Sequence, residues 1–128
     1  MKSIHDADYT HRDLKPANIL LDENDQAVIC DLGSSVKGAI NVKSKRQAQS
    51  IQDEAAEKWV FLFLNNFQKK LRSTLPYRAP ELFQVEVDDV IDTKTDIWSL
   101  GCILYSLIYL EGPFDKFWLK VKVFVLTS

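Results

Sequence analysis

The stretch His11-Arg12-Asp13-Leu14-Lys15-Pro16-Ala17-Asn18, followed further on by Asp31-Leu32-Gly33, decides the fold. Between these two motifs lie two short runs of β-prone residues, 18–21 and 27–30. The polar residues 22–26 separate the runs, so the sequence predicts a β-hairpin with a loop of five or six residues. The hairpin would bring the end of the first motif close to the start of the second.

The predicted hairpin sets two oxygen-bearing side chains across from each other. If Leu21 pairs with Val28, the same register pairs Asn18 with Asp31. Directly opposed residues lie about 4.5–5.5 Å apart at Cα, close enough for a carboxamide and a carboxylate to share magnesium ions. Because Mg²⁺ binds few protein oxygens and keeps phosphate and water ligands, Asn18 and Asp31 predict a metal–nucleotide site.

Two charged residues of the first motif suit the transfer of a phosphoryl group. Asp13 can accept a proton from a hydroxyl held near a metal-bound phosphate, and Lys15 can neutralise charge on the transferring group. Taken singly, Asp13 and Asp31 could be solvated turn carboxylates and Asn18 a strand-edge residue. Their occurrence together favours the catalytic interpretation. We interpret His11 as a packed structural residue, since Asp13 already fills the role of base.

The first motif resembles the catalytic loop of protein kinases, H-R-D-L-x-x-x-N, and the second resembles the metal-binding D-F-G element with leucine for phenylalanine. A third block, residues 73–81, ends in the Ala-Pro-Glu that closes a kinase activation segment. The resemblance implies a protein serine/threonine kinase that transfers the γ-phosphate of ATP to protein substrates. The resemblance implies that Asp13, Lys15 and Asn18 take part in catalysis and that Lys15, Asn18 and Asp31 contact ATP. It also implies that Asn18 and Asp31 bind magnesium. On the substrate side, Thr74 would form hydrogen bonds to Asp13 and Lys15.

The particular residues within and around the motifs resemble those of the Numb-associated kinase family, and within it those of the branch of myristoylated and palmitoylated serine/threonine kinases. The blocks that carry it are Asp31-Leu32-Gly33-Ser34, Arg46-Gln47-Ala48, and residues 77–83, 91–102 and 111–115. Members of this branch carry a helical addition in the activation segment, and the sequence favours a helix over residues 47–58. Arg12, next to Asp13, implies control through that segment, by phosphorylation at Ser50, Ser73 or another site.

A further helix is predicted to begin near Thr95, a suitable N-cap, and to end before Gly112-Pro113. Its apolar residues cover nearly all its faces, and such a helix belongs in the middle of a core. By resemblance, Asp96 holds the catalytic-loop backbone from beneath. The predicted fold class is α+β and mainly α, a fragment of a kinase C-terminal lobe with a catalytic-loop hairpin and a buried central helix.

Other parts of a kinase are not matched. A glycine-rich phosphate loop, a strand lysine with its partner glutamate, and the adenine-binding hinge would lie upstream, so we expect residues 1–128 to be a partial kinase domain that is inactive alone. Residues 59–72 and 117–128 are atypical, and 59–67 could form a partner-binding or membrane-touching helix. The alternatives are a noncatalytic interaction module that binds through residues 77–83, and an unstable splice or gene-model product.

Composition sets wider limits. The 128 residues allow one domain, and a net charge of −2 gives no general attraction to nucleic acid. Two cysteines, Cys30 and Cys102, favour a reducing compartment, and we interpret Cys102 as a small core residue. No signal peptide or membrane span is predicted, and Lys2 excludes N-myristoylation of this form. We expect an intracellular, cytoplasmic protein whose partners are ATP and protein substrates, with membrane association of a longer parent implied only by resemblance.

Overall fold

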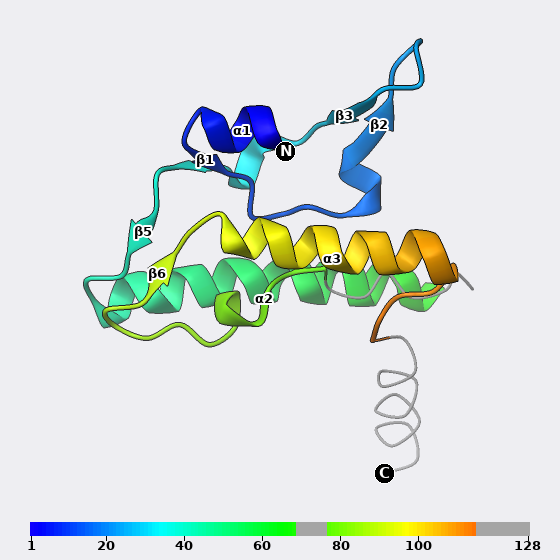
Figure 1. Ribbon diagram of the computed structural model, residues 1–128. Helices are drawn as coiled ribbons and strands as arrows, with labels where there is room; N and C mark the ends of the chain where they lie inside the picture. The colour runs from blue at the N-terminus through cyan, green and yellow to red at the C-terminus, as the bar shows by residue number, and fades with distance from the viewer. Residues whose placement is uncertain (69–76, 115–128) are drawn as a thin grey trace.

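The computed structural model describes residues 1–68 and 77–114 (Figure 1). Within these residues the helices are α1 (Lys2–Asp6), α2 (Lys45–Gln68) and α3 (Lys94–Tyr109). The strands are β1 (Tyr9–Thr10), β2 (Ile19–Leu21), β3 (Ala27–Ile29), β4 (Val36–Lys37), β5 (Ile40–Asn41) and β6 (Val90–Ile91). Short 3₁₀ turns cover Pro16–Asn18, Leu32–Ser34 and Pro80–Leu82. The described chain is thus a mixed, mainly helical structure, as predicted.

The described strands form three separate antiparallel pairs, β1–β4, β2–β3 and β5–β6. The β2–β3 pair is a local hairpin, whereas the others join distant segments. Tyr9 pairs with Lys37 in β1–β4, and Ile40 pairs with Ile91 in β5–β6. In Figure 1 the elements from α1 to β3, coloured blue to cyan, lie above α3. The loop of residues 11–18, which carries the first motif and is called the 11–18 loop below, connects β1 to β2 on this side.

The predicted hairpin is confirmed, but its register differs from the prediction by one residue. Leu21 pairs with Ala27, whereas the prediction paired it with Val28. The N–H of Cys30 donates to the carbonyl of Asn18 at 2.9 Å. Asn18 therefore lies opposite Cys30, and the prediction that it lies directly opposite Asp31 is wrong.

The loop of the hairpin explains this register. The Asp22 N–H donates to the Gln26 carbonyl at 3.0 Å, which extends the ladder by one step. The Asp22 carboxylate accepts the N–H groups of Asn24 and Gln26 at 2.8 Å each. An aspartate that binds its own backbone in this way stabilises a tight turn. The loop consists of residues 22–26 and is one residue shorter than the loop that the predicted register required.

Helix α2 contains the helix predicted over residues 47–58 and is longer at both ends. The N–H of Gln47 donates to Ser44 Oγ at 3.2 Å, and Gln47 Oε1 accepts the N–H of Lys43 at 2.9 Å. The bond to Ser44 Oγ is that of an N-cap side chain, which satisfies an N–H group that a helix start would otherwise leave unbonded. It accounts for the beginning of α2 at Lys45.

One face of α2 forms the main hydrophobic core. The buried cluster brings this face together with the 3₁₀ turn Pro80–Leu82, with β6 and with the residues flanking β5. Its members are Val42, Ala48, Ile51, Ala55, Leu82, Val85 and Ile91. This packing places the segment after residue 77 against α2, and so positions residues 77–79 near the 11–18 loop.

The atypical residues 59–67 continue α2, so the helix proposed there is present. Across residues 1–68 and 77–114, no helix combines the length and apolar character that crossing a bilayer requires. The rest of the atypical segments, residues 69–72 and 117–128, lie outside the described residues.

Helix α3 ends as predicted but starts differently. Thr95 was the predicted N-cap, yet the helix already begins at Lys94, and Thr95 Oγ1 donates to the Asp92 carbonyl at 3.0 Å. The Asp92 carboxylate accepts the Lys94 N–H at 2.8 Å, so the capping side chain lies earlier in the sequence. At the other end Leu110 takes a left-handed conformation and stops the helix before Gly112.

The prediction that α3 is a buried central helix is wrong for the described chain. Only one stripe of α3 is buried, made of Thr95, Asp96, Ser99, Cys102 and Ile103. Large apolar residues on its other faces are exposed, among them Ile97 at 57%, Leu104 at 58% and Leu107 at 71%. The apolar periodicity of α3 indicates which of its faces can be buried, but a face is buried only where another part of the chain packs against it. Within residues 1–68 and 77–114, other parts of the chain cover a single face of α3.

The two cysteines should differ in reactivity. Cys102 is buried, and burial raises the pKa of its thiol. Since the thiolate is the reactive species, Cys102 should be alkylated by iodoacetamide at least about tenfold more slowly than the half-buried Cys30 at pH 8. Peptide mapping by mass spectrometry over a time course measures both rates. Equal rates would contradict the packing of Cys102 in the core.

Candidate active site

The 11–18 loop is held by one buried carboxylate. Asp96, in the first turn of α3, is fully buried and accepts the N–H groups of His11 and Arg12 at 2.8 Å each. His5 Nε2, from α1, lies 2.8 Å from the same carboxylate. Hydrogen bonds to an ionised acceptor are roughly twice as strong as neutral ones, so Asp96 fixes the loop backbone. The support predicted for Asp96 is confirmed, whereas no sequence signal marked His5 as its partner.

Arg12 needs this support because its backbone is strained. Its φ angle is +64°, in the left-handed region that costs a non-glycine residue roughly 1 kcal/mol or more. Asp96 binds the N–H groups of two successive peptide units, those of His11 and Arg12, and so stabilises this conformation.

The side chain of Arg12 contacts the segment that follows the hairpin and α2. Its Nε donates to the Ser34 carbonyl at 2.8 Å, and its Nη2 lies 3.4 Å from Glu54 Oε2 on α2. Arg12 thus links the 11–18 loop to α2 through an acidic residue, which the sequence did not predict. Ser50 is exposed on α2, and its phosphorylation stays a prediction. Ser73 lies outside the described residues.

His11 is a packed structural residue, as predicted. It is fully buried. Its Nδ1 accepts the Asp13 N–H at 3.3 Å, and its Nε2 donates to the Cys30 carbonyl at 3.1 Å. The two ring nitrogens thus bind two different backbone groups. His11 therefore joins the 11–18 loop to the end of β3.

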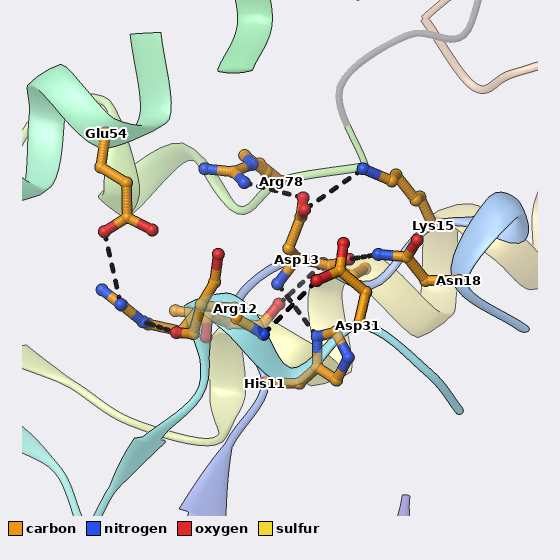
Figure 2. Close-up of polar contacts among 12 residues, drawn as sticks. His11, Arg12, Asp13, Lys15, Asn18, Asp31, Glu54 and Arg78 are labelled. Atoms are coloured by element: carbon orange, nitrogen blue, oxygen red, sulfur yellow. Dashed lines mark hydrogen bonds and ion pairs between the residues drawn. The ribbon is translucent and has the colours of Figure 1, made fainter. Parts of the chain in front are cut away.

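Asp13 is buried, and each of its carboxylate oxygens binds a cation (Figure 2). Arg78 Nη2 donates to Oδ1 at 2.7 Å, and Lys15 Nζ donates to Oδ2 at 3.2 Å. Burial raises the pKa of Asp13, but the bonds and charges of Arg78 and Lys15 outweigh burial and lower that pKa below its ordinary value of 3.8. Asp13 is consequently ionised at neutral pH. Lys15 therefore lies beside Asp13, and its predicted role toward phosphate stays a prediction, whereas the contact of Arg78 with Asp13 was not predicted.

Asn18 and Asp31 both lie in the polar group around Asp13 that Figure 2 shows. Asn18 is buried, and its Nδ2 donates to the Asp13 carbonyl at 2.9 Å, which leaves its amide oxygen as the atom able to bind a metal. Asp31 is exposed, has a left-handed backbone with φ +61°, and accepts the Gly33 N–H at 3.4 Å. Asp31 directly follows Cys30, the residue opposite Asn18.

The donor set of Asn18 and Asp31 fits magnesium better than it fits a metal enclosed by protein. Within residues 1–68 and 77–114, no cluster of three or more His, Cys, Asp or Glu side chains is arranged to hold a metal ion. Mg²⁺ bound with a nucleotide uses one or two protein carboxylates and takes its other ligands from phosphate and water. One carboxylate and one amide oxygen beside Asp13 meet that requirement.

Thr74, the predicted substrate-side residue, lies outside the described residues. The segment just after it is described: Tyr77 Oη lies 3.3 Å from Ser106 Oγ on α3, Ala79 is fully buried, and Arg78 between them reaches Asp13. The alternative of a noncatalytic module used residues 77–83 for binding, and neither interpretation of the sequence predicted that Arg78 contacts Asp13. A contact across 65 positions leaves no local pattern by which to find it.

Comparison with known proteins gives a consistent result. The family model described as protein kinase domain matches residues 1–123. Serine/threonine-protein kinase 16 of Homo sapiens is 46% identical over 120 residues, which cover 94% of this chain and 35% of that protein. Serine/threonine-protein kinase ppk13 of Schizosaccharomyces pombe is 38% identical over 109 residues, covering 84% of this chain and 28% of that protein.

A third relative, serine/threonine-protein kinase ENV7 of Saccharomyces cerevisiae, is 37% identical over 108 residues, 84% of this chain and 26% of that protein. The chain thus spans about a third or less of the length of the curated relatives it matches. The family match extends over nearly the whole sequence and includes every residue of the candidate site. On this evidence the chain belongs to the protein kinase family.

Proposed function

We propose that the protein carrying this sequence is a serine/threonine kinase that transfers the γ-phosphate of ATP to protein substrates, with Asp13 as the base. The family and the names of the similar proteins support the class of enzyme. The single observation that carries the assignment to these residues is the cluster of Asp13, Lys15 and Asn18 on one loop, with Asp31 at the end of the paired hairpin.

The proposed roles follow from the contacts of each side chain. The ionised Asp13 carboxylate would orient the substrate hydroxyl and accept its proton as the new bond to phosphorus forms. Lys15, which lies 3.2 Å from Asp13, would neutralise charge on the transferring phosphoryl group. Asn18 and Asp31 would hold magnesium, which when bound would neutralise negative charge on the phosphate groups of ATP. Phosphoryl transfer depends chiefly on such positioning and electrostatic stabilisation.

We also propose the finer classification. The motifs favour the Numb-associated kinase family and its myristoylated and palmitoylated branch, and similarity to serine/threonine-protein kinase 16 supports a close relationship within the kinases. The long helix α2 between Asp31 and residues 77–82 agrees with the helical addition that this resemblance implies. Under this proposal residues 1–128 form part of a kinase C-terminal lobe.

Asp31 provides the test of the proposed metal role. Asp31→Asn removes the only carboxylate of the proposed donor pair, so the magnesium concentration needed for half-maximal transfer of ³²P from ATP to a protein substrate should rise at least about tenfold. Asp25→Asn is the matched control, because Asp25 lies in the loop of the same hairpin with a similar left-handed backbone, φ +59°, that asparagine tolerates.

The same assay tests the reaction itself. Phosphoamino-acid analysis of the labelled product should give phosphoserine or phosphothreonine. An equal magnesium requirement in Asp31→Asn and Asp25→Asn would remove Asp31 from the metal site. Because residues 1–128 are expected to be inactive alone, the assay uses a protein that carries them within a complete kinase domain. If that protein transfers no phosphate at any magnesium concentration, the proposed enzyme activity is overturned and the noncatalytic interaction module becomes the better hypothesis.

A further inference from the structure

Arg78 and Asp13 form a short ion pair between two largely buried side chains. Arg78 Nη2 lies 2.7 Å from Asp13 Oδ1, and both side chains are only 8% exposed. Lys15 Nζ lies 3.2 Å from the other oxygen and is 20% exposed. A carboxylate that binds a different cation at each oxygen cannot rotate about its Cβ–Cγ bond without losing one of them. The two bonds together therefore set the plane of the Asp13 carboxylate.

Arg78 is itself held on both sides. Its neighbour Tyr77 contacts Ser106 on α3 through their hydroxyl oxygens, 3.3 Å apart. Its other neighbour, Ala79, is fully buried, and the Ala79 carbonyl accepts the N–H of Leu82 at 3.1 Å. Leu82 in turn is part of the hydrophobic core with α2. The guanidinium of Arg78 is thus presented to Asp13 by backbone that the core and α3 fix in place.

We propose that Arg78 is a positioning residue for phosphoryl transfer, which holds the Asp13 carboxylate in the orientation that receives the substrate hydroxyl. This inference rests on the proposed function of Asp13. A carboxylate offers about four acceptor sites, so binding two cations does not by itself prevent it from accepting a hydroxyl proton. A displacement of a catalytic group by about 1 Å can lower the rate roughly 100-fold. A change in the orientation of the Asp13 carboxylate should therefore be measurable as a loss of kcat.

A consequence is that the base depends on the segment on the far side of the site. Arg78 lies 65 positions from Asp13 and four positions after Thr74. If residues 77–82 leave the core or α3, Asp13 loses the cation bound at its Oδ1. The packing of residues 77–82 and the orientation of the Asp13 carboxylate are therefore coupled through the side chain of Arg78.

The test compares Arg78→Met, which removes the charge, with Arg78→Lys, which keeps a cation without the planar fork. Arg46→Met is the matched control, because Arg46 is exposed on α2 and has no role in the site. Steady-state kinetics with ATP and a protein substrate give kcat and KM separately. Amide hydrogen exchange, measured by mass spectrometry without ATP or magnesium, reports on the 11–18 loop independently of activity.

Arg78→Met should lower kcat about 10- to 100-fold while KM for both substrates changes less than about threefold. Exchange in the 11–18 loop should accelerate while exchange in α3 stays at the parental rate, because the change acts on the loop and not on global stability. Arg78→Lys should recover part of kcat, and Arg46→Met should match the parent. In an Asp13→Asn background, Arg78→Met should change the residual rate less than about twofold, since its effect runs through Asp13.

Parental kcat in Arg78→Met, a loss confined to KM, or full additivity with Asp13→Asn would overturn the positioning role. If Arg78→Met fails to fold, Arg78→Lys decides: a several-fold loss of kcat at constant KM supports the proposal, and parental kcat overturns it. If the unsubstituted protein, assayed with these residues inside a complete kinase domain, transfers no phosphate, the proposed function fails. The exchange measurement then decides alone: faster exchange in the 11–18 loop of Arg78→Met supports the restraint by Arg78, and an unchanged rate overturns it.

Discussion

Asp13→Asn is expected to lower the rate of phosphoryl transfer about 10²- to 10⁴-fold, the range that a positioned general base contributes. Asparagine keeps the size of the side chain and one acceptor oxygen, but it cannot take a proton at neutral pH. The effect should fall on kcat, because the proposed contacts with magnesium and ATP come from Asn18 and Asp31. The measurement is the initial rate of ³²P transfer, with KM for ATP determined in parallel.

The control for this substitution must separate lost chemistry from lost structure. Asp13→Asn leaves Arg78 and Lys15, which are largely buried, without their common carboxylate. Circular dichroism and the unfolding midpoint therefore have to be measured with the rate. Asp25→Asn, in the exposed hairpin loop, provides a substitution of the same type that should retain parental activity. A folded Asp13→Asn protein with a rate within about threefold of the parent would exclude Asp13 as the base.

The 11–18 loop could be predicted from the sequence because its functional residues are close together along the chain. Asp13, Lys15 and Asn18 fall within six positions of one another, and the constraint of a single loop is enough to gather them. The contacts Lys15–Asp13 and Asn18–Asp13 are of this kind. Asp96 could be anticipated only through resemblance, since it binds His11 from 85 positions away.

The hairpin shows where strand propensity stops being informative. The two β-prone runs define the strands, but the choice between a five- and a six-residue loop depends on which backbone groups the loop can satisfy. The carboxylate of Asp22 binds two N–H groups of the loop and selects the shorter one. Because register shifts by one residue move every pair, that single side chain decides that Asn18 faces Cys30.

Helix α3 and Arg78 show the limit set by tertiary contacts. The apolar residues of α3 indicate a helix suited to a core, but exposure depends on what packs against it, and Leu107 is 71% exposed in the described chain. Arg78 lies in the stretch that closes the predicted activation segment, and its side chain reaches the buried Asp13. Both outcomes depend on which segments meet in space, and local pattern does not contain that information.

Asp96→Asn is expected to destabilise the protein by about 2–4 kcal/mol, a large part of the 5–15 kcal/mol typical of a folded domain. The carboxylate is fully buried and receives two backbone N–H groups and the ring of His5. Asparagine offers one acceptor oxygen, and its NH₂ group must face a donor that it cannot bind. A buried donor left without its acceptor costs roughly 1–3 kcal/mol, and the left-handed backbone of Arg12 adds to the cost once the bonds that stabilise it weaken.

Urea unfolding followed by circular dichroism measures this loss, and Asp88→Asn is the matched control. Asp88 is exposed and has a φ angle of +77°, which asparagine tolerates, so its replacement should change the free energy of unfolding by less than about 0.5 kcal/mol. Hydrogen exchange distinguishes the cause: in Asp96→Asn the amides of His11 and Arg12 should lose protection first, because they are the donors that lose their acceptor. If both variants unfold at the same urea concentration, the 11–18 loop does not depend on Asp96, and the strained turn at Arg12 must be held by its own side-chain bonds to Ser34 and Glu54.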